Sequence, residues 1–256
     1  MRYQGRHIVV TGASSGIGRA IAARLGEEGA TVSLMARRAA DLAETAAMVE
    51  AAGGRASAIA CDVADASAVD AAFSLAVERS GPLFACVANA GIGGPNEAGP
   101  DDRFRAIVET NLFGTYHAFR AAEARFQPDG TRHLLATASI LARIGVGGYT
   151  GYCASKAAVL GLVRAFAAEL GRKRVQVNAV CPGWVETDMA WEGIDGMAAA
   201  MGVDRAKALA VAMKQVPTGR MGKPSEVAGT IAYLLSDDAA GMTGQGIDIN
   251  GGAWMG

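Results

Sequence analysis

The stretch "HIVVTGASSGIG", residues 7–18, decides the fold of this chain. A short apolar run, residues 7–11, leads directly into Gly12, Gly16 and Gly18. Glycine permits a tight turn and lets the backbone approach another group closely. A strand that passes through such a turn into a helix predicts a dinucleotide site, with the pyrophosphate at the helix N-terminus. The alternative is an ordinary tight connection between a strand and a helix.

Apolar runs alternate with helical patterns along the rest of the chain. The expected strands are 7–11, 31–36, 56–62, 84–88, 133–139, 175–180 and 246–249. The expected helices are 16–28, 42–52, 66–79, 102–126, 153–170 and 225–235. Continuously apolar strands joined by helices predict the α/β class, here a single-domain Rossmann fold whose doubly wound parallel sheet has helices on both faces. One domain is expected over residues 1–256, with a flap over the site at about 187–222.

Composition narrows the classes of function. The net charge of −1 and the lack of a large basic cluster argue against a nucleic-acid partner. No apolar run has the length of a membrane span or the pattern of a secretory signal, so a cytoplasmic protein with no membrane partner is expected. The histidines and cysteines lack metal-ligand spacing, so no metal is predicted. Buried free thiols are expected at Cys61, Cys86, Cys153 and Cys181.

The end of the second expected strand predicts which dinucleotide binds. NAD-binding proteins carry an Asp or Glu there to bond the ribose hydroxyls, whereas this chain has Ala36, followed by Arg37 and Arg38. Guanidinium groups match the geometry of a 2′-phosphate, so NADP(H) is the predicted cofactor, with NAD(H) as the runner-up. The alternative is that both arginines are solvated surface residues.

A tyrosine and a lysine four residues apart form the predicted catalytic pair. Tyr152 and Lys156 lie on one face of an expected helix, and an ammonium beside a phenol is expected to lower its pKa from about 10. Tyr152 can then act as an acid or base near neutral pH. Tyr149 has Cys153 at the same spacing and is the weaker candidate. Ser139 ends a strand at the carboxyl edge, where parallel sheets meet their ligands.

These motifs occur in the order and spacing of a known family. From residue 5 to the C-terminus the chain resembles the classical short-chain dehydrogenases/reductases. The matching positions are Thr11, Gly12, Gly16, Gly18, Asp62, Val63, Asn89, Ala90, Gly91, Asn111, Ser139, Tyr152, Lys156, Pro182, Gly183 and Thr187.

The resemblance implies a role for each catalytic position. Tyr152 would donate a proton to a substrate carbonyl as hydride arrives from the nicotinamide. Lys156 would lower the pKa of Tyr152 and bind the nicotinamide ribose, and Ser139 would hydrogen-bond the carbonyl oxygen. Asn111 would hold a water that links Lys156 to solvent.

The resemblance also implies a set of cofactor-binding residues. Asp62 and Val63 would flank the adenine, while the Val185 backbone and the Thr187 hydroxyl would fix the carboxamide. The full predicted set is Gly12, Ser14, Ser15, Gly16, Ile17, Gly18, Arg37, Arg38, Asp62, Val63, Asn89, Ala90, Gly91, Tyr152, Lys156, Pro182, Gly183, Val185 and Thr187.

The predicted function is an NADP(H)-dependent oxidoreductase that interconverts a ketone or aldehyde with an alcohol. Apolar residues of the flap and of the expected site edge favour an apolar or aromatic substrate, although they could equally pack the flap; they are Ile140, Leu141, Ile144, Trp184, Met189, Trp191, Met197 and Met201. Arg143 could bind a substrate carboxylate or lie on the surface. The alternatives are an NAD-dependent dehydrogenase of a secondary alcohol or dihydrodiol, and a non-catalytic dinucleotide sensor. A homo-oligomer, a tetramer, is expected.

Overall fold

Seven parallel strands form one sheet in this computed structural model, which describes residues 1–256. They are β1 (His7–Thr11), β2 (Thr31–Ala36), β3 (Arg55–Ala60), β4 (Ala85–Ala88), β5 (Arg132–Thr137), β6 (Val175–Pro182) and β7 (Gly246–Ile249). The spatial order is β3-β2-β1-β4-β5-β6-β7, so the order reverses between β1 and β4. Ligands of such sheets bind beyond the carboxyl ends of the strands at this reversal. The predicted doubly wound fold is confirmed.

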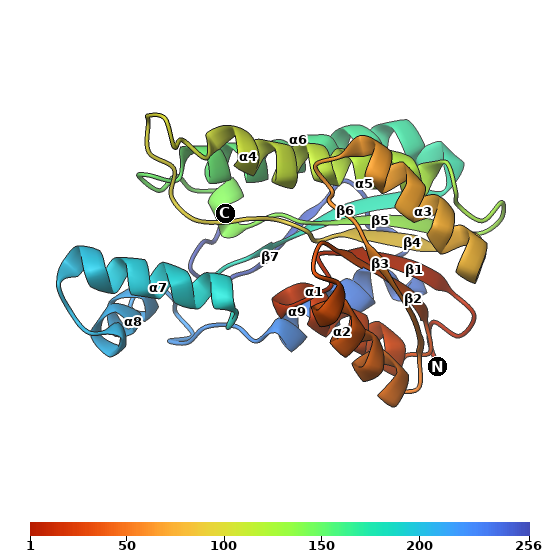
Figure 1. Ribbon diagram of the computed structural model, residues 1–256, viewed down its shortest axis with the longest axis horizontal. Coiled ribbons are helices and arrows are strands. Elements are labelled where there is room, and N and C mark those ends of the chain that lie inside the picture. Colours follow the sequence, from red (N-terminus) through yellow and green to blue (C-terminus); the bar gives the residue numbers. More distant parts are fainter.

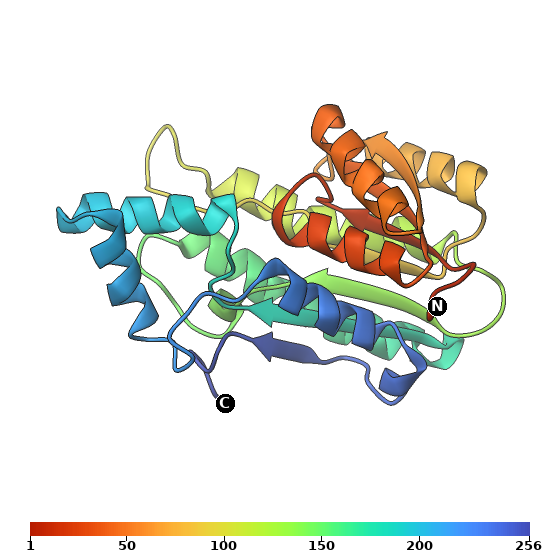
Figure 2. The ribbon, with the colours of Figure 1, turned by 90° about the horizontal axis from the view of Figure 1, so that it is seen from below.

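Helices cover both faces of the sheet (Figure 1). One face carries α1 (Gly16–Glu27), α2 (Ala39–Ala51) and α9 (Pro224–Leu234). The other carries α3 (Ala66–Ser80), α4 (Phe104–Val108), α5 (Gly114–Glu123) and α6 (Thr150–Leu170). Short 3₁₀ turns occupy Ile140–Ala142, Gly171–Lys173 and Asp237–Ala239. Figure 2 shows α1 and α9 side by side beneath the sheet, although most of the chain separates them in sequence.

The two helical layers enclose separate apolar cores, which explains why the strands read as continuously apolar. In β1, Val9 joins the core under α3, α5 and α6, whereas Ile8 and Val10 join the core under α1 and α9. Successive side chains of a strand point to opposite faces, so both sets must be apolar.

The predicted helix 102–126 is interrupted, which corrects the sequence interpretation. A π-helical turn, Glu109–Phe113, separates α4 from α5. Such a turn contains an extra residue that a period of 3.6 cannot reveal, and π turns are frequent at functional sites. Its centre is Asn111, which is fully buried.

Two further differences affect the site. Helix α6 begins at Thr150, before the predicted start at 153, so Tyr152 lies within its first turn. The predicted flap contains two helices, α7 (Asp188–Met201) and α8 (Arg205–Met213), which project beyond the end of β6 and share a small core of their own (Figure 1).

The four cysteines are free, as predicted, but Cys153 is only partly buried. No helix is both long enough and apolar enough to cross a bilayer.

Candidate active site

The glycine loop packs so closely that side chains would not fit. Gly12 and Gly16 have φ values of 65° and 53°, a region that favours glycine. A Cβ on Gly12 would lie 2.7 Å from the Ala90 Cα, and one on Gly18 would lie 2.1 Å from the Gly12 carbonyl oxygen. The loop therefore holds α1 directly against the end of β1 and beside the β4 loop.

The N-terminus of α1 is open to an anion. Its N-cap, Ser15, makes no side-chain cap hydrogen bond, and no acidic residue lies in the first turn. The first N–H groups of a helix need partners, and with the helix dipole they favour a phosphate. A Cβ on Gly16 would lie 3.1 Å from Thr187 Cγ2, so the start of α7 borders the same loop. These residues fit a dinucleotide pyrophosphate.

Two arginines follow β2, and one of them bonds to the serines of this loop. Arg38 Nη2 donates to Ser15 Oγ at 3.1 Å and to Ser14 Oγ at 3.3 Å, and Arg38 also pairs with Asp41. The Arg37 guanidinium lies 4.0 Å from the Asp62 carboxylate. Their side chains are 68% and 61% exposed, so both guanidinium groups can still reach a phosphate. This arrangement fits a 2′-phosphate beside the glycine loop.

Asn89 braces the loop from the neighbouring strand. Its Nδ2 donates to the Thr11 and Gly12 carbonyl oxygens at 3.2 and 3.3 Å, and its Oδ1 accepts from Thr137 Oγ1 at 3.1 Å. Thr11 Oγ1 in turn accepts from the Asn89 and Ala90 N–H groups. Asn89, a predicted cofactor-binding residue, is thus tied to β1 and to β5.

The predicted catalytic residues converge at the carboxyl end of β5. Ser139 follows this strand, and Lys156 is 4% exposed with its Nζ 5.7 Å from the centre of the Tyr152 ring. A Cβ on Gly91 would lie 3.1 Å from Asn111 Oδ1 and 3.4 Å from Lys156 Nζ. Residues from four separate segments therefore share one site.

The electrostatics differ from the sequence expectation. Burial raises the pKa of Tyr152, and the Ser139 side chain partly offsets this through a hydrogen bond. The Lys156 ammonium instead donates to the Thr137 carbonyl at 2.7 Å, and burial lowers its own pKa to about 8. The net shift of the Tyr152 pKa is therefore upward, opposite to the expected lowering, and the contribution of Lys156 to it stays a prediction. A raised pKa keeps the phenol protonated, as a proton donor requires.

The Asn111 side chain ties the π turn to two neighbouring segments. Its Nδ2 donates to the Ile92 carbonyl and to Ser155 Oγ, each at 3.1 Å, and its Oδ1 accepts from the Ile92 N–H at 2.8 Å. The Asn111 carbonyl accepts from Thr115 Oγ1 at 2.8 Å. Both N–H groups of the side-chain amide are thus engaged and its Oδ1 accepts one hydrogen bond, and the expectation that Asn111 holds a water linking Lys156 to solvent stays a prediction.

Residues 12–253 match the sequence family described as enoyl-(acyl carrier protein) reductase. The chain belongs to the short-chain dehydrogenase/reductase (SDR) family. The matched range includes the glycine loop, the π turn and the Ser139, Tyr152 and Lys156 cluster.

Individual relatives support the same assignment for this SDR. The short-chain reductase protein NovJ of Streptomyces niveus is 37% identical over 246 residues, 95% of this chain and 92% of NovJ. The 3-oxoacyl-[acyl-carrier-protein] reductase FabG of Vibrio harveyi is 34% identical and aligns over 100% of both chains. A solved variant of actinorhodin polyketide ketoreductase with NADPH has a TM-score of 0.91 at 37% identity, with 97% of each chain covered. This SDR is an oxidoreductase of the ketoreductase type.

The segment after β6 links the SDR cofactor cleft to the flap. Thr187 Oγ1 accepts from the Ala190 N–H at 3.3 Å, which makes Thr187 the N-cap of α7, and it donates to the Val185 carbonyl at 3.1 Å. A Cβ on Gly183 would lie 3.0 Å from the Asn250 Cα, so the predicted Pro-Gly turn packs directly on the end of β7. The Thr187 hydroxyl therefore has a structural role beside its predicted one.

The apolar residues of the flap divide into two groups. Trp184, Trp191 and Met197 pack against the small core of α7 and α8. Met189 is 45% exposed and reaches across to the β4 loop, where a Cβ on Gly93 would lie 2.9 Å from its sulfur. Packing on α7 and α8 therefore accounts for the first group, and Met189 bridges from α7 to the β4 loop.

Arg143 is not free to bind a carboxylate. Its Nη2 lies 3.3 Å from the Asp248 carboxylate and donates to the Gly246 carbonyl at 2.9 Å. Its guanidinium also stacks 5.0 Å from the centre of the Trp254 ring. These contacts hold the loop after Ser139 against β7 and pair the Arg143 guanidinium with a carboxylate of this chain.

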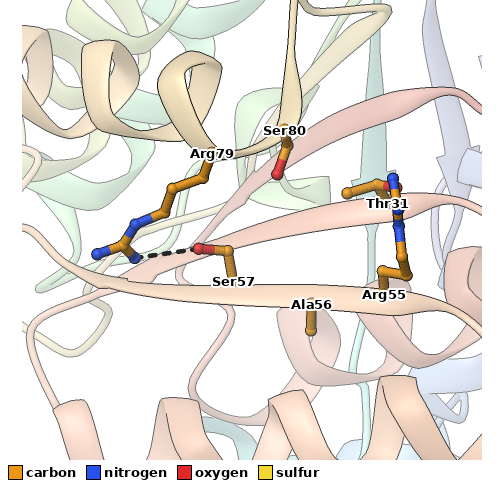
Figure 3. A pocket seen from close by; sticks show the side chains of 6 residues that line it. All are labelled: Thr31, Arg55, Ala56, Ser57, Arg79 and Ser80. Carbon is orange, nitrogen blue, oxygen red and sulfur yellow. Dashed lines mark hydrogen bonds between the residues drawn. The ribbon is translucent and has the colours of Figure 1, made fainter.

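A polar pocket at the opposite edge of the sheet is a poor candidate for the active site (Figure 3). It opens where β2 and β3 begin, at Thr31 and Arg55, and where α3 ends near Arg79. Its groups already bond to one another: Arg79 Nη1 donates to Ser57 Oγ at 3.1 Å, and Arg55 donates to Thr31 Oγ1 at 3.2 Å (Figure 3 shows the first). No group of three or more acidic, Cys or His side chains is placed to hold a metal ion.

The close packing of Gly18 leads to a first prediction. Gly18→Ala is expected to lower the free energy of unfolding by about 3 kcal/mol and to weaken NADPH binding, because its Cβ would collide with the Gly12 carbonyl. Urea denaturation and fluorescence titration with NADPH measure the two effects. Gly196→Ala, at an open helical position, is the control and should leave stability unchanged or slightly higher. Wild-type stability in Gly18→Ala would show that α1 can move away from β1.

The buried lysine leads to a second prediction. Lys156→Met is expected to raise the free energy of unfolding at pH 7 by about 2 kcal/mol, because the buried charge costs more than its hydrogen bond to Thr137 returns. The pKa of Lys156 is about 8 in the folded protein and 10.5 for an ordinary lysine. At pH values between the two, the unfolded state therefore binds more protons than the folded state. The free energy of unfolding of the wild type thus rises with pH across this window, and the difference in stability between Lys156→Met and the wild type becomes smaller.

Urea denaturation of wild type and Lys156→Met at pH 7 and pH 10 measures this difference. Lys214→Met, which removes an exposed ammonium, is the control and should show no pH-dependent difference from wild type. An advantage of Lys156→Met that is equal at both pH values would contradict the depressed pKa.

Proposed function

We propose that this SDR is an NADP(H)-dependent carbonyl reductase that interconverts a ketone or aldehyde with the corresponding alcohol. The observation that carries the proposal is the convergence of Ser139, Tyr152 and Lys156 at the carboxyl edge of the sheet, the edge at which α1 begins with an open N-terminus. A proton donor, an oxyanion partner and a phosphate cradle together serve carbonyl reduction, and a simple sensor needs only the last of them.

The residues of this chain would divide the chemistry as follows. The bound nicotinamide supplies hydride to the carbonyl carbon. Tyr152 gives its phenolic proton to the carbonyl oxygen, and its raised pKa keeps that proton in place until the oxygen becomes basic. Ser139 hydrogen-bonds the same oxygen where negative charge develops. Lys156, with one N–H engaged by Thr137, has two left for ribose hydroxyls and the path to solvent.

The cofactor assignment rests on the residues after β2. Ala36 offers no acid for ribose hydroxyls, while Arg38 presents an exposed guanidinium group beside the serines of the glycine loop and Arg37 presents one near Asp62. The NADPH in the actinorhodin ketoreductase structure supports the same choice. NADP(H) is therefore the proposed cofactor.

The proposed substrate class is an apolar or aromatic ketone. Met189 of α7 and Ile144 of the loop after Ser139 are exposed apolar side chains on segments that border the predicted site, and Arg143 is paired with Asp248. The relatives include reductases of 3-oxoacyl thioesters and a polyketide ketoreductase, both of which act on ketones by their names. A β-keto group on an apolar chain or ring is the form of this class to test first.

A substrate panel tests the proposal. Purified protein is assayed for NADPH and NADH consumption with a 3-oxoacyl thioester and with aliphatic, aryl and cyclic ketones. Turnover with NADPH exceeding that with NADH is the expected result. Tight NADPH binding without turnover on any carbonyl, or on alcohols and diols in reverse, would overturn it in favour of a dinucleotide sensor.

We also propose that this protein acts as a homo-oligomer, a tetramer, as the family resemblance implies. The exposed aromatic side chains Phe113 and Tyr116 at the π turn and on α5, 49% and 40% accessible, support this assembly, because large apolar surfaces often mark subunit contacts.

A further inference from the structure

The first turn of α6 carries Tyr152 but lacks a cap of its own. The N-cap residue, Tyr149, makes no side-chain cap hydrogen bond, and no acidic residue lies in the first turn. The first N–H groups of a helix have no intrahelical partner, and an uncapped first turn frays. The helix that carries the proposed proton donor therefore needs a partner from elsewhere in the chain.

That partner is Asn96, in the loop between β4 and α4. Its Oδ1 accepts from the Gly151 N–H at 2.8 Å, the position that a normal N-cap side chain serves. Its Nδ2 donates to Thr150 Oγ1 at 3.0 Å, and its own N–H donates to the Gly148 carbonyl at 2.8 Å. Asn96 is thus bonded to three residues at the start of α6.

A second residue fixes the orientation of the Asn96 amide. Asp102 Oδ1 accepts from Asn96 Nδ2 at 3.1 Å and from the Phe104 N–H at 2.9 Å. Because a carboxylate only accepts, it holds the NH₂ group toward itself and turns Oδ1 toward Gly151. Asp102 is itself anchored at the start of α4, so the cap connects the first turns of α4 and α6.

We propose that Asn96 is a positioning residue for catalysis, which caps α6 from the β4–α4 loop and so holds Tyr152 against Ser139. The proposal rests on the proposed function, because it assigns Asn96 a role at the same site. Asn96 does not touch the glycine loop or the arginines after β2, so its contribution is to the proton donor and not to cofactor affinity. Misplacing a reacting group by about 1 Å can cost about 10²-fold in rate.

Two variants distinguish an effect of the cap on catalysis from an effect on the stability of the whole protein. Asn96→Ala removes every side-chain bond of the cap. The double variant Asn96→Asp with Asp102→Asn exchanges the amide and the carboxylate between the two positions. The carboxylate at 96 can still accept from the Gly151 N–H, and the amide at 102 can donate to that carboxylate. A carboxylate is also favourable at a helix N-terminus, so the exchange should keep the cap.

The expected result is a split between kinetic constants. Asn96→Ala should lower kcat for ketone reduction roughly tenfold while the Kd for NADPH stays within about twofold, and the exchanged double variant should recover most of kcat. Hydrogen exchange of the Gly151 and Tyr152 amides should accelerate in Asn96→Ala and return to the wild-type rate in the double variant. Asn96→Ser, too short to reach Gly151, gives the same expectation if Asn96→Ala does not fold.

Other outcomes would overturn the proposal. Wild-type kcat in the folded single variants would show that the cap does not position Tyr152. A double variant as slow as Asn96→Ala, with restored amide protection, would show that capping and catalysis are unconnected. Hydrogen exchange does not require turnover, so failure of the cap is distinguishable from failure of the proposed function: in the latter case the wild type itself turns over no carbonyl.

Discussion

Tyr152→Phe is expected to lower kcat for ketone reduction by NADPH about 10³-fold while leaving the Kd for NADPH within about twofold of wild type. The substitution removes one hydroxyl and keeps the ring, so the packing of α6 is retained. The phenol is the proposed proton donor, and burial raises its pKa so that it stays protonated over the whole neutral range. Without it, the carbonyl oxygen must take its proton from water.

Single-turnover kinetics and fluorescence titration with NADPH measure the two quantities. Tyr149→Phe is the matched control, since it removes a phenolic hydroxyl just before the same helix and should leave kcat near the wild-type value. Equal losses in both variants would indicate a general disturbance of α6. A Tyr152→Phe variant with wild-type kcat would exclude Tyr152 as the proton donor.

The second large effect concerns the cofactor. Arg37→Ala combined with Arg38→Ala is expected to raise the Kd for NADPH about 10²-fold and to change that for NADH by less than about threefold. Each guanidinium would give charge-assisted hydrogen bonds to a 2′-phosphate, a group that NADH lacks. Both side chains are more than half exposed, so solvent weakens their interaction with a phosphate. We therefore expect each charge-assisted hydrogen bond to contribute a binding free energy at the lower end of the range for such bonds.

Titration of both cofactors against the wild type, the two single variants and the double variant measures the preference. Arg55→Ala, which removes an arginine at the opposite edge of the sheet, is the control and should alter neither Kd (Figure 3). A wild-type preference for NADH, or a double variant with an unchanged ratio of the two Kd values, would contradict the cofactor assignment.

The fold of this SDR could be read from the sequence because its determinants are local or periodic. The apolar strands are buried on both faces, so each appears as one continuous run, and the alternation with helices specifies a parallel sheet. Gly12, Gly16 and Gly18 form a motif that needs no knowledge of distant residues. Sequence order and spacing likewise predicted that Ser139, Tyr152 and Lys156 belong to one site.

Contacts between distant segments decided the rest. The Asn111 side chain at the centre of the π turn bonds to Ile92 and Ser155, and no pattern of period 3.6 contains these contacts. The pKa of Tyr152 depends on burial beneath several elements, and a spacing of four residues to Lys156 says nothing about that burial.

The same holds for the side chains around the site. Arg143 is neutralised by Asp248, and α6 is capped by Asn96, and in each case the partners are far apart in the chain. By itself, the sequence determined the sheet, the glycine loop and the list of reactive groups, because apolar periodicity and glycine geometry act over a few residues. Only the tertiary structure decided which polar groups are free, paired or buried, because hydrogen bonds and desolvation depend on neighbours brought together by folding.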